Sequence, residues 1–278
     1  MDRRHFLELS ATAAAGLAAQ TRRSGFKVGM CCWNMQDCNL TVFDTAAKIG
    51  LDGVQLGIPR TEQEKLTLRR PEVQEQFRAA AKRTGVEILG TACQFGKPLK
   101  TEPVAALVLH DWIEVTRNLG ARVILVPFFG KANILDVNVK EEFDRVVAVL
   151  RELAPRAEKS NVILGLENTL SAADNRKILD AVGSPAVKVY YDVGNSTNNG
   201  HQVLEEIRAL GKEYICEFHI KDGRNLLGQG KIDMPAIAQA IRDIGYGQWL
   251  VLETSSPTGL VADTKTNLAY VRQVFTKG

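Results

Sequence analysis

The amino-acid sequence predicts a single α/β domain built as a closed (β/α)8 barrel. After residue 25 the chain alternates short β-rich segments with longer helical patterns, and this alternation occurs eight times. An open, doubly wound sheet is the competing arrangement, but no Gly-x-Gly-x-x-Gly motif follows the first predicted strand. The 278 residues are 45% hydrophobic, which suits one large domain, and we find no linker that would divide it.

Eight predicted strands supply the barrel. They are short and rich in Val, Ile and aromatic residues, as strands of a buried parallel sheet are. In chain order they span residues 26–32, 52–58, 86–93, 122–128, 162–168, 187–193, 214–220 and 248–254.

Helical patterns occupy the segments between the strands. The segment 70–85 has Pro71 in its first turn and ends at Gly85, which matches the residue preferences of helix starts and stops. The segments 141–160 and 234–245 carry apolar residues three and four positions apart, the spacing of one buried helix face. Strands and helices together predict a barrel domain over residues 25–278.

Residues 1–24 are predicted to be a twin-arginine signal peptide. Arg3 and Arg4 precede Phe6 and Leu7, and an alanine-rich, mildly apolar stretch follows them. This stretch is too short and too weakly apolar to span a bilayer, so we expect no stable membrane anchor. An ordinary amphipathic N-terminal helix is the alternative. The signal predicts a periplasmic or otherwise exported protein.

Charge and cysteine content exclude several classes of partner. The net charge is +3 and the basic residues are spread along the chain, so nucleic acid is not expected to bind. The five cysteines are odd in number and form no Cys-x-x-Cys pair. This predicts buried thiols rather than a disulfide scaffold or a structural zinc site. The sequence leaves open whether the protein forms a homo-oligomer.

Acidic and imidazole side chains end the last four predicted strands. These residues are Glu167, Asp192, His219 and Glu253. Active sites of (β/α)8 barrels lie at the C-terminal ends of the strands, so the four side chains are expected to converge there. Three converging carboxylates repel one another unless a divalent cation lies between them. The donor set suits Mn²⁺, Mg²⁺ or Co²⁺, with Zn²⁺ as a further candidate. The alternative is that the groups are scattered and pair with Arg or Lys.

Four segments at these strand ends resemble the sugar phosphate isomerase/epimerase family, which has the xylose isomerase-like TIM barrel. The segments are GLEN (165–168), YYDVGN (190–195), FHIKDGRNLLGQGKID (218–233) and LVLET (250–254), and the resemblance covers nearly the whole chain from residue 26. It implies that Glu167, Asp192, His219 and Glu253 bind one divalent metal. It also implies that Glu167 and Glu253 face the sugar carbon from opposite sides.

The chain departs from the ketose epimerases of this family at two positions. Ala173 stands where they have a substrate-contacting glutamate, and Asn195 stands where they have a histidine. The resemblance therefore leaves the substrate and the reaction open.

The expected chemistry is proton abstraction next to a metal-bound carbonyl. A metal that binds the carbonyl oxygen and a neighbouring hydroxyl oxygen stabilises the enolate-like charge, so the C–H between them becomes more acidic. Glu167 or Glu253 is the expected base that removes this proton. Return of the proton on the other face gives an epimer, and return at the neighbouring carbon gives an isomer. Loss of a β-oxygen gives elimination.

Five further residues are candidate substrate-binding residues: Lys221, Arg224, Trp33, Asn195 and Phe128. Lys221 shares a strand face with His219, and Arg224 lies in the loop that follows. Trp33 and Phe128 end the first and fourth strands, where an aromatic wall for a sugar would lie. Each also has an ordinary explanation, as an ion-paired lysine, a turn asparagine or a packed aromatic ring.

The sequence thus predicts a divalent-metal-dependent isomerase or epimerase of a keto-sugar or related polyol, whose partner is a small-molecule sugar or glycoside. The alternative is a lyase of the same superfamily, acting on a keto-inositol or a 3-keto-glycoside. Export favours unphosphorylated substrates. An abasic-site endonuclease is disfavoured, because it assembles three zinc ions with several histidines and few histidines follow residue 24. The four-ligand set disfavours a non-catalytic sugar-binding barrel.

Overall fold

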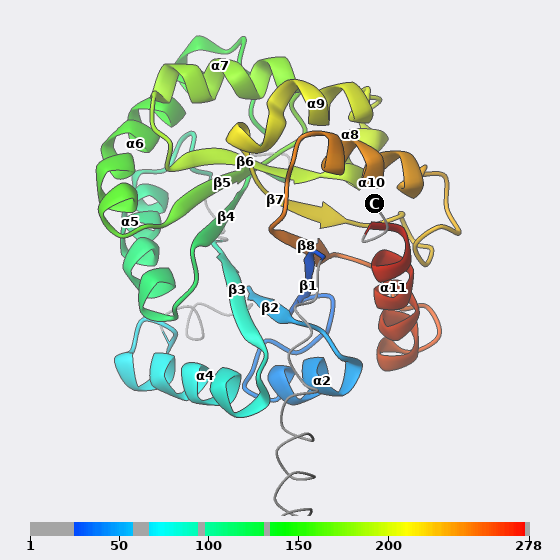
Figure 1. The fold of residues 1–278 in the computed structure, drawn as a ribbon. Coiled ribbons are helices and arrows are strands. Elements are labelled where there is room, and N and C mark those ends of the chain that lie inside the picture. The colour runs from blue at the N-terminus through cyan, green and yellow to red at the C-terminus, as the bar shows by residue number, and fades with distance from the viewer. Residues whose placement is uncertain (1–24, 58–66, 94–97, 131–133, 276–278) are drawn as a thin grey trace, which may run out of the picture.

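A closed barrel of eight parallel strands forms the centre of the protein (Figure 1). The computed structural model describes residues 25–57, 67–93, 98–130 and 134–275. Each strand is hydrogen-bonded to the next along the chain, and the last pairs with the first. The strands are β1 (Lys27–Cys31), β2 (Gly53–Leu56), β3 (Glu87–Ala92), β4 (Val123–Pro127), β5 (Ile163–Glu167), β6 (Val187–Asp192), β7 (Ile215–Ile220) and β8 (Trp249–Leu252). The predicted (β/α)8 fold is confirmed, and every strand lies within its predicted segment.

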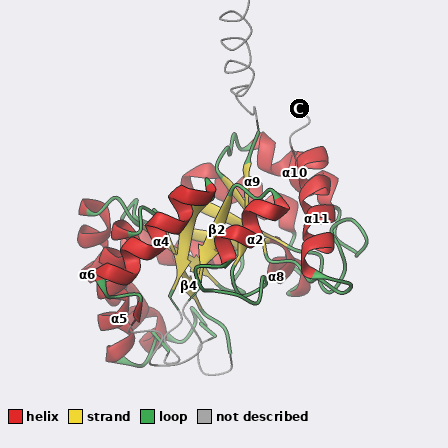
Figure 2. Ribbon diagram, turned by 90° about the horizontal axis from the view of Figure 1, so that it is seen from below, coloured by secondary structure: helices red, strands yellow, loops and turns green. Residues whose placement is uncertain are grey.

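Helices surround the barrel, as the view from below in Figure 2 also shows. Within the described residues they are α2 (Val42–Ile49), α4 (Pro71–Thr84), α5 (Pro103–Asn118), α6 (Lys140–Lys159), α7 (Ala172–Val182), α8 (Val193–Asn198), α9 (Val203–Tyr214), α10 (Met234–Asp243) and α11 (Leu260–Phe275). Pro71 begins α4 and Gly85 ends it in the left-handed conformation, as predicted. The short helix α8 was not expected from the sequence. It follows β6 directly and precedes α9.

Two buried clusters hold these layers together. The larger contains outward-facing strand residues and the apolar faces of the helices. The smaller fills the barrel interior and consists of Cys31, Leu89, Ala92, Val123, Leu125, Tyr190, Cys216 and Val251. Gly165 belongs to this crowded interior, since a Cβ there would lie 2.7 Å from the Cys216 sulfur. The filled interior leaves the strand ends as the places for a site.

The cysteines differ in part from the prediction. Cys31, Cys93 and Cys216 are free and buried, as expected, but Cys32 and Cys38 form a disulfide. The chain turns back on itself directly after β1, where the Asp37 amide donates to the Cys32 carbonyl, and this brings the two Cα atoms to 4.9 Å. Sequence spacing does not show such a turn, so the pair was missed.

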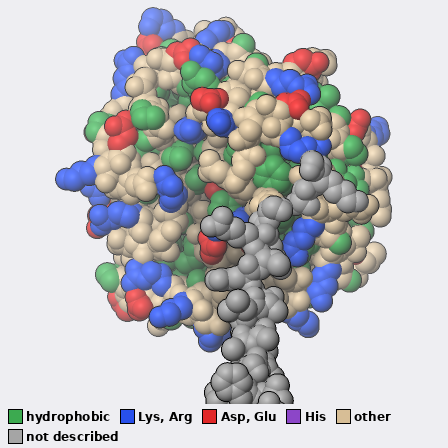
Figure 3. Space-filling view, in the orientation of Figure 1, with side chains coloured by type: hydrophobic (Ala, Val, Ile, Leu, Met, Phe, Trp, Pro, Cys, Tyr) green, Lys and Arg blue, Asp and Glu red, His purple; other side chains and the backbone are tan. Residues whose placement is uncertain are grey.

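The surface seen in Figure 3 carries basic and acidic side chains intermixed with apolar ones. Among the described residues, no helix has both the length and the apolar character required to cross a bilayer. The predicted signal peptide, residues 1–24, lies outside the described residues.

Candidate metal centre

The four side chains predicted to bind a metal meet at the C-terminal ends of β5 to β8. Glu167, Asp192, His219 and Glu253 each offer one ligand atom, and these atoms lie within 4.8 Å of one another. The structure therefore brings together the set that the sequence singled out. Their role as metal ligands remains a prediction.

The strand register explains why these side chains converge. Asp192 pairs directly with His219 across β6 and β7. Glu253 follows β8, and its backbone amide donates to the Ile220 carbonyl at the end of β7. Parallel neighbours in register end at the same level of the barrel, so their last side chains share one mouth.

His219 lies at the centre of the cluster and is fully buried. Its Nδ1 lies 3.0 Å from Glu167 Oε1, 3.6 Å from Asp192 Oδ2 and 3.7 Å from Glu253 Oε2. Its other nitrogen, Nε2, lies 3.0 Å from Gln55 Oε1 on β2. An amide oxygen only accepts hydrogen bonds, so Nε2 carries the proton that it donates to Gln55. In the neutral ring this leaves the Nδ1 lone pair aimed at the carboxylates, the arrangement in which a histidine binds a metal.

Burial shapes the charges in the cluster. Burial raises the pKa of Glu167 to about 7, although the neighbouring His219 opposes the shift. Burial alone would also raise the pKa of Asp192, but contacts with His219 and the Lys221 ammonium hold it well below its usual range. Asp192 is thus held ionised, whereas Glu167 takes up a proton near neutral pH.

The composition of the cluster fits a divalent cation. Three carboxylates face one ammonium, because Lys221 Nζ lies 2.7 Å from Asp192 Oδ2 and 2.6 Å from Glu253 Oε2. Burial alone would lower the pKa of His219, but the neighbouring acidic groups raise it well above its usual range. Even with a protonated imidazole, the three ionised carboxylates outnumber the two cations and leave an excess of negative charge at a buried position. Hard oxygen donors and one nitrogen match Mn²⁺, Mg²⁺ or Co²⁺, and a cation there would neutralise this excess.

Three of the predicted substrate-binding residues lie at this site. Lys221 bridges Asp192 and Glu253, as described above. The Trp33 indole N–H donates to Glu253 Oε1 at 3.0 Å. Asn195, in α8, lies with its side-chain nitrogen 3.4 Å from Glu167 Oε1. These contacts give each residue a place next to a carboxylate, and their roles toward a substrate remain predictions.

The other two predicted residues lie farther from the cluster. Arg224 is exposed and lines a pocket together with Trp33. Phe128 is 1% exposed and packs in the larger cluster, outside the barrel interior. This packing explains Phe128 as a core residue and gives it no open surface for a sugar.

The glycine-rich loop after β7 is pinned by Asp222. This buried carboxylate accepts hydrogen bonds from the backbone amides of Gly230 at 2.8 Å and Ile232 at 3.2 Å. A Cβ at residue 230 would lie 2.1 Å from Asp222 Oδ1, so the close approach requires glycine. The loop next to His219 and Lys221 is therefore fixed by a residue of its own.

Sequence reasoning missed Gln55, which is fully buried and holds His219. The available signal was an amide inside the apolar strand segment GVQLG. Cys31, whose sulfur lies 3.3 Å from His219 Nε2, was predicted only as a buried thiol.

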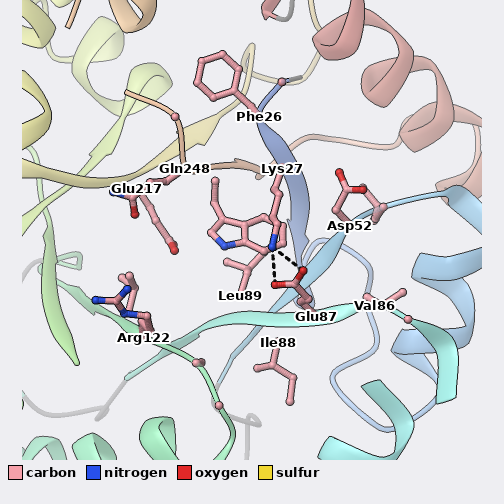
Figure 4. Close-up of a pocket in the computed structure, with 18 of the residues that line it drawn as sticks. Phe26, Lys27, Asp52, Val86, Glu87, Ile88, Leu89, Arg122, Glu217 and Gln248 are labelled. Carbon is pink, nitrogen blue, oxygen red and sulfur yellow. Dashed lines mark hydrogen bonds and ion pairs between the residues drawn. The ribbon is translucent and has the colours of Figure 1, made fainter. Parts of the chain in front are cut away.

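A second hollow, of about 1050 Å³, opens at the opposite end of the barrel. Figure 4 shows that strand-start residues line it, with the ion pair between Lys27 and Glu87 near its centre. Glu217 also lines this hollow, and burial raises its pKa to about 8. The hollow is larger than the pocket beside the metal centre, but the potential metal-binding cluster lies at the other end of the strands. The hollow lies at the N-terminal ends of the strands, the end of a (β/α)8 barrel that contributes to stability.

Fold and site together define an α/β barrel whose strand ends form a potential divalent-metal centre. The family profile described as "Xylose isomerase-like TIM barrel" matches residues 43–274, so the chain belongs to this family.

Similar proteins include several sugar epimerases. The chain is 28% identical over 261 residues to the 2-epi-5-epi-valiolone 7-phosphate 2-epimerase of Actinoplanes sp., a match that covers 89% of this chain and 94% of that protein. It is 28% identical to the L-ribulose 3-epimerase of Mesorhizobium japonicum over 54% of this chain and 53% of that one.

Solved structures share the fold at lower identity. D-Psicose 3-epimerase from Clostridium cellulolyticum H10 superposes with a TM-score of 0.76 at 20% identity, covering 90% of this chain and 99% of that one. The 3-keto-D-glucoside 4-epimerase of E. coli superposes with a TM-score of 0.74 at 17% identity, covering 89% and 99%.

Proposed function

We propose that this protein is a divalent-metal-dependent epimerase or isomerase of a keto-sugar or related polyol. The observation that carries the proposal is the placement of two glutamates around one imidazole. Glu167 ends β5, Glu253 follows β8, and both carboxylates lie within 4 Å of His219 Nδ1. Acid–base chemistry on two faces of one carbon needs two such groups from different directions.

The contacts of each residue indicate its role in the reaction. When bound, the metal supplies Lewis-acid stabilisation of the negative charge that develops on a sugar oxygen. Glu167 or Glu253 removes the proton from the carbon next to the sugar carbonyl, and the other carboxyl returns it. Trp33 and Lys221 hold Glu253 in place through its two oxygens. Asn195 lies beside Glu167, where it orients this carboxylate or a sugar hydroxyl.

The similarity to a 2-epimerase over most of both chains supports epimerisation. Elimination begins with the same proton abstraction, so a lyase acting on a keto-inositol or 3-keto-glycoside is the second candidate. The chain is also similar to the 3-oxo-isoapionate decarboxylase of Pectobacterium atrosepticum, 29% identical over 52% of this chain. This similarity supports a lyase, an enzyme that breaks a bond in its substrate, as the second candidate.

The test is exchange of a substrate C–H with solvent deuterium. Metal-loaded protein is incubated with a panel of keto-sugars and 3-keto-glycosides in D₂O, and NMR follows the exchanging carbon and the product. Removing a general base costs about 10²–10⁴-fold in rate, so Glu167→Gln and Glu253→Gln should each lose at least that much. Glu205→Gln, at an exposed position of α9, is the matched control and should keep full activity. Turnover of any substrate without exchange or an isotope effect at that carbon would rule out proton abstraction.

We also propose that the protein is exported by the twin-arginine route. The Arg3-Arg4 signal motivates this proposal. The Cys32–Cys38 disulfide supports it, because disulfides persist mainly in oxidising compartments. Export in turn favours an unphosphorylated substrate.

A further inference from the structure

A pocket of about 570 Å³ lies beside the metal centre, between the loops that follow β1, β7 and β8. Trp33 lines this pocket and also donates to Glu253, so one side chain belongs to both places. Thr254, another lining residue, directly follows Glu253 in the chain. The pocket and the metal centre are therefore adjacent.

The residues that line this pocket offer polar groups that an occupant can reach. They include the Gln36 amide, the Ser255 hydroxyl and the Arg224 guanidinium, none of which is buried. Hydroxyls and amides both donate and accept hydrogen bonds, which matches the hydroxyl groups of a sugar.

The wall formed by the loop after β1 is held in place from three directions. The Cys32–Cys38 disulfide closes this loop around Trp33 and Asn34. The Asn34 side-chain nitrogen donates to the Thr254 carbonyl at 3.2 Å. Gly57 lies against the indole, since a Cβ there would be 2.8 Å from Trp33 Cε3. A wall fixed before binding loses little conformational entropy when a ligand arrives.

The charge of the pocket favours a neutral, hydroxyl-bearing occupant. Arg224 is the one charged residue among the described residues that line it, and the remainder are uncharged polar or apolar side chains. A guanidinium donates hydrogen bonds to hydroxyls as well as to anions. Trp33 adds an aromatic surface for the apolar face of a sugar ring. A lining with a single cation and otherwise uncharged side chains fits a sugar better than a phosphate.

We propose that this pocket is a second sugar subsite, which holds the ring joined by a glycosidic bond to the ring at the metal centre. The substrate class is then a glycoside or disaccharide rather than a free monosaccharide. This inference rests on the proposed function, because it places the reacting ring beside Glu253. Trp33 divides the two subsites and is a specificity-determining residue.

The test measures sugar binding without requiring turnover. Titration calorimetry on the metal-loaded full chain compares D-glucose, the disaccharides cellobiose, maltose and trehalose, and glucose 6-phosphate. At least one disaccharide should bind ten times more tightly than D-glucose or more. Ser256→Phe fills the pocket and should reduce this advantage to less than twofold. Thr266→Phe, at an exposed position of α11, should retain it.

Arg224→Met provides a second variant at an exposed position, where folding is not at risk. It should weaken disaccharide binding at least threefold. Equal affinities for glucose and all three disaccharides would overturn the subsite, as would an advantage that survives Ser256→Phe. Tightest binding of glucose 6-phosphate would assign the pocket to a phosphate instead. The proposed function fails separately, through absence of deuterium exchange during turnover.

Discussion

Loading the metal centre should raise the melting temperature of the protein by several degrees. Each pair of ionised carboxylates in the cluster, with ligand atoms at most 4.8 Å apart, repels by at least about 3.5 kcal/mol at an effective dielectric constant near 20. A cation that binds the folded state alone stabilises it by about 2.7 kcal/mol at a hundred times its Kd. For a chain of this size each kcal/mol corresponds to about 2–4 °C, so the expected rise is about 5–11 °C.

The assay is a thermal melt of chelator-treated protein with and without Mn²⁺, Mg²⁺, Co²⁺ or Zn²⁺. Asp192→Asn is the informative variant, because it removes one carboxylate charge and keeps an oxygen that can accept from the Asn195 amide, as Asp192 Oδ1 does at 2.7 Å. Asparagine and aspartate are equally good at this helix-capping position, so the fold should persist. The metal-induced rise should disappear in this variant. Asp243→Asn, at the end of α10, should keep it.

The rise should also depend on pH in a defined direction. Burial raises the pKa of Glu167 to about 7, so in the metal-free protein this carboxyl is largely protonated at pH 6 and largely ionised at pH 8. A cation must displace this proton, which makes metal binding weaker at the lower pH. The melting-temperature rise at a fixed metal concentration should therefore be larger at pH 8 than at pH 6. No rise with any of the four cations, or an equal rise in Asp192→Asn, would refute the assignment of the centre.

Three further predictions concern the loop after β1 and the N-terminus. Reducing the Cys32–Cys38 disulfide should lower the free energy of unfolding by about 2 kcal/mol, and a thiol titration of the denatured, unreduced protein should find three free thiols; a count of five would show that the bond is absent. Gly57→Ala should cost about 1–3 kcal/mol in a denaturant titration, because its methyl group overlaps Trp33, whereas Gly247→Ala, with open space around it, should change little. Cell fractionation of the Arg3→Lys/Arg4→Lys variant should find the protein retained in the cytoplasm, and unchanged export would contradict the signal assignment.

The residues at the strand ends could be predicted because a short apolar run marks each strand and because the parallel strands of a barrel end at one mouth. A polar residue that closes such a run therefore has a predictable position. Glu167, Asp192 and His219 illustrate this, since each lies at or next to the end of its strand. The fold and the convergence of the cluster therefore followed from pattern alone.

Contacts between residues far apart in the sequence, and the geometry of turns, could not be predicted in this way. Gln55 and His219 are 164 residues apart, and no periodic pattern indicates that their side chains meet. The Cys32–Cys38 disulfide depends on a turn whose geometry the spacing does not reveal. An aromatic residue at a strand end suits the core as well as a sugar-binding wall, and tertiary packing places Phe128 in the core.

The distribution of polar groups around the mouth bears on which substrate this chain accepts. On the β5 side, the position that resembles a substrate-contacting glutamate of ketose epimerases is Ala173, an exposed residue in α7. On the opposite side, the pocket beside Trp33 offers the polar side chains of Gln36, Arg224 and Ser255. A site that lacks one polar contact and offers others elsewhere favours substrates that reach the others. A monosaccharide held at the metal centre alone would not reach these groups, whereas a glycoside that extends past Trp33 would contact them. The departures from the ketose epimerases and the pocket beside the metal centre thus support the same substrate class.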